Sequence, residues 1–264
     1  MLKKLFDKLR SNMLWGQNYQ DKFIPATEDI FVGGKDRDNY RLIGIYYLKQ
    51  FISLCGLQRD WKVLDVGCGS GRLTVPLALY LRKGSYYGID IVPAGINWCL
   101  EKIKPHFPNV NFELADVHNA HYNPNGNEYA DKYSFPYADN TFDLIFLTSV
   151  FTHMKTSDVE NYTSEIHRVL KPKGRCLITF FIFDEDSAEG IRQKKSRELF
   201  THDCGQYLAA NSESHELAIA YRIEYLEDLF RRNNLSIQLI KKGGWRWRKD
   251  GPPGHTQDKI IVVK

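Results

Sequence analysis

The sequence predicts an α/β fold, with a doubly wound, mostly parallel sheet of seven strands flanked by helices. Short apolar runs rich in β-branched and aromatic residues alternate along the chain with amphipathic segments, an order typical of a parallel sheet. The first run passes directly into a glycine-rich turn and a helix-like segment, VLDVGCGSGRLTVPLALYL at residues 63–81. The last two runs have no helix between them, so the final strand has to pair in the antiparallel sense.

The individual elements follow from local patterns. The runs that predict strands cover residues 62–66, 85–90, 110–116, 141–148, 175–183, 235–241 and 259–263. The periodic segments that predict helices cover residues 39–57, 71–81, 93–104, 157–170 and 223–232. Pro76 lies inside the second helix and predicts a kink there, whereas Pro93 suits the first turn of the third. Ser157 and Glu160 have the spacing of a capping box, which predicts the start of the fourth helix.

Three stretches between these elements differ in character. Residues 171–174, KPKG, predict the turn that ends the fourth helix. Residues 118–140 form an irregular stretch of about 20 residues, and a stretch of that length inside a compact domain is usually functional or disordered. Residues 184–216 are polar and mixed, and we expect them to form a cap over the ligand-binding edge of the sheet.

The turn after the first strand has the composition of a ligand cradle. Its glycines, Gly67, Gly69 and Gly71, let the backbone turn sharply and approach a ligand closely. The helix that follows offers free N–H groups at its start. The dinucleotide-binding pattern G-x-G-x-x-G does not fit, because Arg72 occupies the place of its third glycine. Asp65, just before the turn, places a carboxylate that suits a cationic group better than a pyrophosphate.

Acidic residues also end the next two strands. Asp90 closes the second strand about 20 positions beyond the glycine turn, the separation at which an acid reaches a ribose hydroxyl pair. Asp116 closes the third strand. Each acid alone is equally well explained as a helix N-cap, but three strand-terminal acids around one turn predict a ligand site.

These motifs resemble those of the class I S-adenosylmethionine-dependent methyltransferases, whose first motif is similar to DVGCGSG at residues 65–71. The resemblance implies a Rossmann-like methyltransferase fold, S-adenosyl-L-methionine as the methyl donor and S-adenosyl-L-homocysteine as the product. It implies that the glycine turn wraps the methionine part of the donor, that Asp90 binds its ribose and that Asp116 binds its adenine amino group. The cofactor-binding residues that it implies are Asp65, Gly67, Cys68, Gly69, Gly71, Arg72, Asp90, Ile91, Asp116, Val117, Thr148 and Ser149.

The resemblance covers residues 30–264, and we expect a single methyltransferase domain over residues 1–264. The parts that we expect are an N-terminal helical segment, a cofactor-binding core, a cap insertion, and a C-terminal helix with a strand pair, at residues 1–57, 58–183, 184–220 and 221–264.

The segment after the fourth strand, TSVFTHM at residues 148–154, bears on the acceptor. It lacks the Asn/Asp-Pro-Pro-Tyr motif of enzymes that methylate the amines of DNA bases, and no Pro-Cys pair follows a strand, as in cytosine-C5 methylation. Later motifs such as IHRVLKPKG at residues 166–174 resemble the broad small-molecule subfamily, and the tail resembles a narrower bacterial group linked with surface-polysaccharide or glycolipid synthesis. We therefore expect a small-molecule or glycan acceptor, methylated at oxygen or nitrogen.

His153 is the candidate general base. It lies just past the fourth strand, where donor and acceptor meet, and a hydroxyl acceptor has to lose its proton; the alternative is a histidine that orients the loop. His118 and Tyr122 follow the third strand and are candidates to line the acceptor pocket; for His118 the alternative is a position on the cofactor side or in solvent. Asp184 and Asp186 end the fifth strand and suit an acceptor hydroxyl or a metal, but no compact spacing of ligands requires a metal, so we expect none.

Trp245 and Trp247 lie among basic residues in the loop 243–256. This interleaving suits stacking on a sugar, which would make Trp245 a substrate residue, or on a single-stranded nucleic acid. It equally suits a surface hairpin whose indoles pack on the sheet edge.

Bulk composition limits the partners and the location. The net charge is only +4, with 32 acidic residues spread through the chain, which argues against a nucleic-acid partner. The five cysteines form no C-x-x-C pair and are expected to be reduced thiols of a cytoplasmic protein. No apolar run reaches the ~18 residues of a membrane span, and the N-terminus has no signal-peptide pattern. Residues 1–10 have helical periodicity and a basic face, suited to packing on the domain or to peripheral contact with an anionic membrane.

Other functions stay open on the sequence alone. An RNA methyltransferase predicts a continuous basic face and salt-sensitive RNA binding. A nicotinamide-dependent dehydrogenase is disfavoured by Arg72 in the glycine turn. A non-catalytic S-adenosylmethionine-binding protein predicts cofactor binding without turnover.

Overall fold

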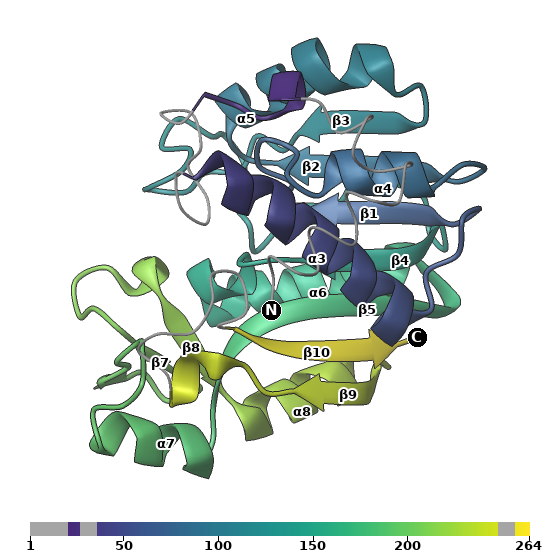
Figure 1. The fold of residues 1–264 in the computed structure, drawn as a ribbon. Helices are drawn as coiled ribbons and strands as arrows, with labels where there is room; N and C mark the ends of the chain where they lie inside the picture. The colour runs from purple at the N-terminus through teal and green to yellow at the C-terminus, as the bar shows by residue number, and fades with distance from the viewer. Residues whose placement is uncertain (1–20, 27–35, 248–256) are drawn as a thin grey trace.

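The structure is a computed structural model that describes residues 21–26, 36–247 and 257–264. Its main sheet has the strand order β3-β2-β1-β4-β5-β10-β9 (Figure 1). These strands are β1 (Lys62–Val66), β2 (Ser85–Asp90), β3 (Val110–Leu114), β4 (Phe142–Leu147), β5 (Leu170–Phe183), β9 (Ser236–Lys241) and β10 (Asp258–Val263). Neighbouring strands pair in parallel except at β10, which runs antiparallel to both β5 and β9. The predicted doubly wound sheet with an antiparallel last strand is confirmed.

Helices cover both faces of this sheet. They are α3 (Arg37–Cys55), α4 (Thr74–Tyr80), α5 (Pro93–Trp98), α6 (Thr156–Val169) and α8 (Ile223–Arg232). The first three pack on one face and the last two on the other, and Figure 1 shows α3 in front of the sheet and α6 behind it. Successive strand residues point to opposite faces, so Leu144 of β4 joins the core under α3, while Ile145 joins the core under α6. A sheet buried on both faces explains why its strands read as nearly continuous apolar runs.

Three short strands extend the sheet beyond the predicted seven. They are β6 (His202–Asp203), β7 (Tyr207–Ala209) and β8 (Ile219–Arg222). β8 pairs in parallel with the last residues of β5, from Phe181 onward, and β7 and β6 follow in antiparallel pairs. No strand was predicted within residues 184–216, which contain β6 and β7, or at β8, which follows them. These strands are too short to show an alternating pattern, and α7 (Glu185–Arg192) precedes them in the same segment.

Two predictions about helix starts are wrong. The second predicted helix begins later than expected, at Thr74, so Pro76 lies in its first turn, where no intrahelical hydrogen bond is lost and the kink has no cause. α6 begins before Ser157, which is already inside the helix. The N–H of Lys155 donates instead to the carboxylate of Asp158 at 3.2 Å.

The predicted turn at residues 171–174 is part of β5. The pairing of β4 with β5 shifts register between Phe142 and Leu144, and Lys173 has a positive φ of 66°. The N–H of Lys173 donates to the carbonyl oxygen of Lys264 at 2.9 Å. The residues that indicated a turn are thus accommodated as an irregularity at the start of a strand.

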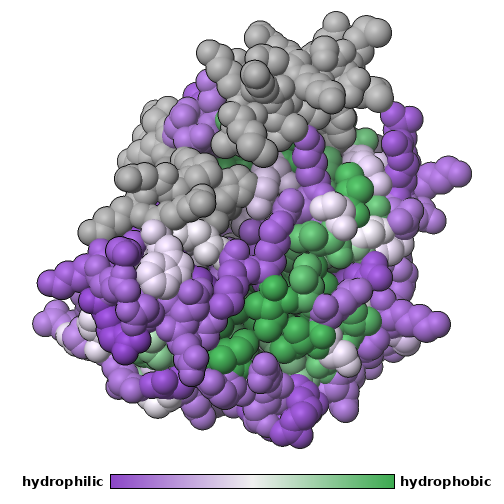
Figure 2. Space-filling model, turned by 60° about the horizontal axis from the view of Figure 1, so that its bottom comes forward, coloured by the Kyte–Doolittle hydropathy of each residue, from purple (hydrophilic) through white to green (hydrophobic). Residues whose placement is uncertain are grey.

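The surface contains an apolar area and an open sheet edge. Figure 2 shows hydrophobic residues gathered on the face that lies at the bottom of Figure 1, within a mainly hydrophilic surface. Among the described strands β9 pairs with β10 alone, and Leu239 of β9 is 37% exposed. In the described ranges, no helix combines the length and apolarity needed to cross a bilayer. The predictions for residues 1–10 lie outside the described residues.

Candidate active site

A cavity of about 790 Å³ opens where the carboxyl ends of β1, β2 and β4 meet. In open α/β sheets this is the edge at which ligands bind, and the volume lies within the ~300–1,000 Å³ of small-molecule pockets. The predicted cofactor residues that line it are Asp65, Gly67, Cys68, Gly69, Arg72, Asp90, Ile91, Val117, Thr148 and Ser149. The fold therefore brings most of the predicted set to one place.

The glycine turn adopts a conformation that requires glycine. Gly67, Gly69 and Gly71 have φ angles of 81°, 56° and 80°, in the left-handed region that other residues rarely adopt. A Cβ atom on Gly67 would lie 2.4 Å from Cγ2 of Val150, so the turn packs directly on the loop after β4. The N–H of Gly67 donates to the carbonyl oxygen of Ile89 at 2.8 Å, which ties the turn to β2.

Asp90 holds this turn in place from the end of β2. Its Oδ2 accepts from the N–H of Gly69 at 2.6 Å, and its Oδ1 accepts from the N–H of Val92 at 2.8 Å. The side chain is buried, and burial raises the pKa of Asp90 although the backbone N–H groups lower it. Each carboxylate oxygen keeps a further lone pair, so the same group can also accept from a ligand hydroxyl.

Asp65 supplies an unsatisfied acceptor on the cavity wall. The hydroxyl of Tyr86 donates to its Oδ2 at 2.7 Å, whereas its Oδ1 is buried without a hydrogen-bond partner. Burial, together with the nearby charge of Asp90, raises the pKa of Asp65 to about 8, although Tyr86 and Arg72 lower it. A buried acceptor without a donor is costly, and a cationic donor would satisfy both its lone pair and its charge.

Helix α3 closes a side of the cavity that the sequence did not indicate. Asn39, Ile43 and Tyr47 of this helix line the cavity. The hydroxyl of Tyr40 donates to the carbonyl oxygen of Ser70 at 2.8 Å, so the helix is bonded to the glycine turn itself. The broad apolar face of residues 39–57 predicted the helix, but an apolar face does not say on which surface a helix packs.

The predicted acceptor residues His118, Tyr122 and His153 line the same cavity. The ring centroids of Tyr122 and His153 are 5.9 Å apart in an edge-to-face arrangement. Nδ1 of His153 lies 2.9 Å from the carbonyl oxygen of Glu216. Because a carbonyl oxygen only accepts, Nδ1 carries the proton and Nε2 keeps the basic lone pair. Burial lowers the pKa of His153 below its ordinary value of 6.5, which favours the neutral imidazole at pH 7.

Ser149 has an unusual backbone conformation in the loop after β4. Its φ of 59° lies in the left-handed region although it is not glycine, and such strain costs about 1–3 kcal/mol and clusters at functional sites. Its N–H donates to Oγ1 of Thr179 at 2.8 Å, and its Oγ donates to Oε1 of Gln257 at 2.9 Å. Gln257, just before β10, also lines the cavity and was not predicted.

Charged residues that the sequence did not single out also line the cavity. They are Asp131, Lys155, Asp158, Arg197 and Glu216. Lys155 Nζ lies 3.6 Å from Oε1 of Glu216, and burial raises the pKa of Asp158. These residues come from the irregular segment 118–140, from the start of α6 and from the segment after α7. Only the tertiary fold brings such distant positions together, so no local pattern could have found them.

Two predicted cofactor residues do not line the cavity. A Cβ atom on Gly71 would lie 2.6 Å from Cδ1 of Ile103, so this glycine allows the turn to pack on the helix after β2. Oδ2 of Asp116 accepts from Nδ2 of Asn127 at 2.7 Å, and the neighbouring Val117 lies on the cavity wall instead. Asp116 lies two residues beyond the end of β3, and its contact with the adenine amino group stays a prediction.

Trp245 is wrong as a substrate residue. Its side chain is fully buried, its indole Nε1 donates to Oδ2 of Asp258 at 2.8 Å, and its ring packs on Phe181 and Phe200. A buried indole has no face on which a sugar or a base can stack. The alternative interpretation, in which the indole packs against the sheet, is therefore confirmed for Trp245.

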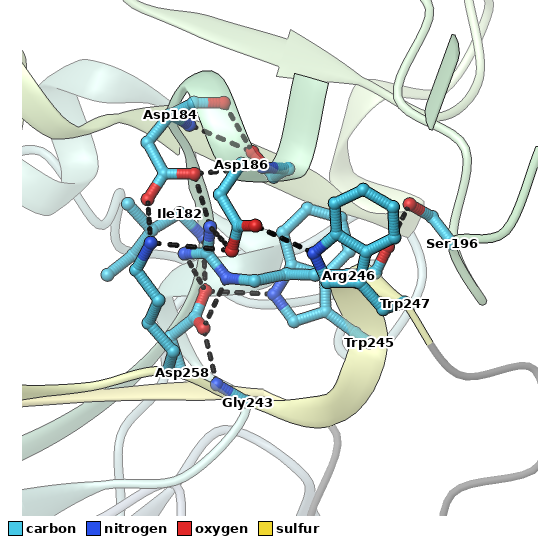
Figure 3. A network of polar contacts seen from close by, with 11 residues as sticks. Ile182, Asp184, Asp186, Ser196, Gly243, Trp245, Arg246, Trp247 and Asp258 are labelled. Atoms are coloured by element: carbon cyan, nitrogen blue, oxygen red, sulfur yellow. Dashed lines mark hydrogen bonds and ion pairs between the residues drawn. The ribbon is translucent and has the colours of Figure 1, made fainter. Parts of the chain in front are cut away.

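Asp184 and Asp186 face protein partners, as Figure 3 shows. Asp184 pairs with the guanidinium of Arg246 and caps α7 by accepting from the N–H of Ser187 at 2.9 Å. Asp186 accepts from Nε1 of Trp247 at 2.8 Å. These carboxylates are therefore occupied with structural contacts. In the part of the chain that the structure describes, no group of three or more His, Cys, Asp or Glu side chains is arranged to hold a metal ion.

The sheet order, the positive-φ glycine turn and the carboxylates at the ends of β1 and β2 define a class I S-adenosylmethionine-dependent methyltransferase domain. The unpaired Oδ1 of Asp65 fits the α-ammonium group of this cofactor, and the glycine turn fits its close approach.

Comparisons with known proteins agree. A family profile described as a methyltransferase domain matches residues 57–218. A phosphoethanolamine N-methyltransferase of Arabidopsis thaliana is 29% identical over 168 residues, which are 62% of this chain and 30% of the plant protein. A demethylmenaquinone methyltransferase of Tropheryma whipplei is 27% identical over 191 residues, 72% of this chain and 69% of that protein. The solved structure of magnesium protoporphyrin IX methyltransferase from Synechocystis PCC 6803, with bound S-adenosylhomocysteine, covers 99% of both chains at 14% identity and a TM-score of 0.55.

The chain belongs to the methyltransferase domain family, whose profile matches more than half of it. The domain is S-adenosylmethionine-dependent, and S-adenosyl-L-methionine is its cofactor. The chain spans about 30% of the length of the plant relative, and the acceptors in the relatives' names belong to those proteins.

Proposed function

We propose that this chain transfers the methyl group of S-adenosyl-L-methionine to a hydroxyl or an amine of a polar small molecule or glycan. The observation that carries the proposal is the placement of a neutral histidine, His153, beside a wall of charged side chains in the cavity that holds the glycine turn. We place this activity in a single domain spanning the chain, with the segment 184–220 contributing Arg197 and Glu216 to the acceptor end.

For the donor, we propose that two carboxylates bind two different parts of the cofactor. Oδ1 of Asp65 accepts from the ammonium group, since it is the buried oxygen that lacks a donor. Asp90 accepts from a ribose hydroxyl while its two backbone bonds keep the glycine turn in place. When bound, the cofactor supplies an activated methyl group on a sulfonium, so orientation by the protein can provide much of the acceleration.

For the acceptor, His153 acts as the general base. Glu216 fixes the Nδ1–H tautomer, so Nε2 is the atom that takes the acceptor's proton. A hydroxyl loses this proton as its oxygen bonds to the methyl carbon, whereas an ammonium group has to lose it first to free the nitrogen lone pair. In both cases the methyl–sulfur bond breaks and its electron pair stays on sulfur. Tyr122 packs edge-on against the imidazole and restricts its orientation. The depressed pKa of His153 keeps this base unprotonated at neutral pH.

The charged wall supports a polar acceptor over a quinone-like one. The apolar ring and side chain of a quinone-like acceptor would displace water from Asp131, Asp158 and Arg197 without replacing its hydrogen bonds. A polar acceptor would replace that water. Among the relatives, the one named for phosphoethanolamine is therefore the closer chemical guide than the one named for demethylmenaquinone.

The test is a turnover screen that detects S-adenosylhomocysteine with sugars, nucleotide sugars, phosphorylated amines and quinones as acceptors. We expect turnover with a polar member of this set. We also expect His153→Ala to lower kcat at least about tenfold, because general bases usually contribute about 10²–10⁴-fold. Binding of S-adenosylhomocysteine to the variant should be unchanged. His202→Gln, at an exposed position of β6, is the matched control.

The pH profile separates a base from a loop-orienting histidine. For the parent enzyme, kcat/KM should rise with pH to a plateau, with a midpoint below 6.5 because burial lowers the pKa of His153. This rise at acidic pH, the acidic limb of the profile, should disappear in His153→Ala. A variant that keeps both full turnover and the acidic limb excludes His153 as the base, and turnover confined to RNA or to quinones contradicts the polar small-molecule acceptor.

A further inference from the structure

Arg197 and Gln257 lie on the cavity wall and share one buried support. Arg197 belongs to the segment after α7, and Gln257 precedes β10, so they are far apart in sequence. The support is the side-chain network around Arg246 and Asp258, drawn in Figure 3. Both of these charged side chains are buried, with Arg246 1% exposed and Asp258 0% exposed.

Asp258 is the centre of the network because it accepts from several donors at once. Its Oδ1 accepts from the N–H of Gly243 at 2.6 Å and from Nε of Arg246 at 3.1 Å. Its Oδ2 accepts from the N–H of Ile182 at 2.8 Å, from Nε1 of Trp245 at 2.8 Å and from Nη2 of Arg246 at 3.1 Å. These five hydrogen bonds hold the Asp258 side chain in one orientation. They therefore also restrict the backbone of the preceding residue, Gln257.

The same network holds the backbone at Arg197. The N–H of Arg197 donates to the carbonyl oxygen of Trp245 at 2.8 Å. Oγ of the buried Ser196 donates to the carbonyl oxygen of Arg246 at 2.6 Å. Arg197 and Gln257 are therefore joined through Trp245, whose carbonyl bonds one segment and whose indole bonds the other.

Both side chains bring donors that the described chain leaves unused. The Oγ of Ser149 donates to Oε1 of Gln257, so the amide NH₂ of Gln257 remains available, with no partner among the described residues. Of the cavity-lining cations, Lys155 lies beside Glu216, and the charge of Arg72 acts on Asp65. Arg197 makes no side-chain hydrogen bond or ion pair in the described part of the chain, although its charge acts on the neighbouring Glu198.

We propose that Arg197 and Gln257 form a subsite for an oxyanion group, a phosphate or a carboxylate, carried by the methyl acceptor. A guanidinium and an amide are the donors that recognise such a group. The role of this subsite in catalysis depends on the proposed function, because the anion is part of the methyl acceptor. Two acids on the same wall, Asp158 and Glu216, face Lys155 through its backbone N–H and its ammonium group.

A binding experiment tests the subsite without any known acceptor. Protein saturated with S-adenosylhomocysteine is titrated calorimetrically with inorganic phosphate and, separately, with acetate. We expect Arg197→Gln to weaken binding of the preferred anion at least about tenfold, the loss of roughly one charge-assisted hydrogen bond. Gln257→Leu should weaken it less. Arg192→Gln, an exposed arginine of α7 paired with Glu189, should leave it unchanged. Equal anion binding by the parent protein and Arg197→Gln, or no binding to either, overturns the subsite.

A kinetic experiment then uses acceptor pairs that differ only in the anion. Phosphoethanolamine is compared with ethanolamine for the phosphate, and glucuronate with glucose for the carboxylate. We expect Arg197→Gln to raise KM for the member that carries the anion at least about tenfold, with kcat little changed and the member without the anion unaffected. Equal effects on both members overturn the subsite. If no acceptor turns over, the proposed function fails, while the phosphate titration still decides whether the oxyanion subsite exists.

Discussion

At the scale of single residues, the two carboxylates beside the glycine turn act differently although each ends a neighbouring strand. Asp90 is already bonded to two backbone N–H groups and shapes the turn. Asp65 has one oxygen bonded to Tyr86 and one oxygen with no donor, and its pKa is raised to about 8. Without a ligand, Asp65 is therefore mainly protonated at pH 7, whereas an ammonium group in contact with it favours the ionised form.

This difference predicts that cofactor binding releases a proton. Below pH 8 the free protein carries the proton on Asp65 and the complex does not, so the affinity for S-adenosylhomocysteine should rise up to about tenfold per pH unit between pH 6 and 8 and level off above it. Titration calorimetry at pH 7 in buffers of different ionisation enthalpy should report close to one proton released. Asp65→Asn should bind more weakly and without this pH dependence. A pH-independent affinity in the parent protein contradicts the ammonium contact.

Sequence reasoning at this scale succeeded where the chemistry is local. The glycines and the strand-terminal acids of β1 and β2 stand in fixed spacing around one turn, so their meeting follows from the βα connection alone. It failed for Trp245, because a tryptophan among basic residues has the same sequence whether its indole is exposed or buried.

At the scale of elements, α3 sets the position of the glycine turn by close packing. A Cβ atom on Gly44 of α3 would lie 2.5 Å from the carbonyl oxygen of Arg72 and 3.1 Å from Cγ of Pro76. The helix backbone therefore rests against the backbone after the turn, and the hydroxyl of Tyr40 bonds the turn directly. The helical pattern of residues 39–57 predicted α3, but only the absence of a side chain at Gly44 permits this approach.

Gly44→Ala should separate the helix from the turn. We expect it to destabilise the protein by about 1–3 kcal/mol through overpacking, despite the better helix propensity of alanine. It should also weaken binding of S-adenosylhomocysteine, because the turn would lose its support. Urea unfolding with and without the cofactor product measures both effects. Ser53→Ala, at an exposed position of the same helix, is the control and should change stability by no more than about 0.5 kcal/mol. Stability and binding equal to the control would show that α3 is not in contact with the turn in solution.

At the scale of the whole molecule, the predicted parts of the fold are those built from neighbouring segments. The order of strands and helices and the antiparallel last strand were predicted from local pattern and connection rules. The extension by β6, β7 and β8, and the charged wall of the cavity, were not. Both depend on contacts between segments far apart in the chain, as when β8 pairs with the end of β5 or Gln257 meets Ser149. Such contacts have no signature in the spacing of residues.

The network around Arg246 and Asp258 is a long-range contact of this kind, since it joins β5, α7, β10 and the turn before residue 247. Asp258→Asn would leave the buried guanidinium of Arg246 without its main counter-charge, and breaking a buried ion pair costs about 3–5 kcal/mol. We expect the lower end of that range, because Asp184 still faces Arg246. Asp228→Asn, which breaks exposed pairs on α8, should cost less than about 1 kcal/mol. The midpoints of urea unfolding compare the two variants, and equal small losses would mean that this buried network does not hold the C-terminal strands to the rest of the domain.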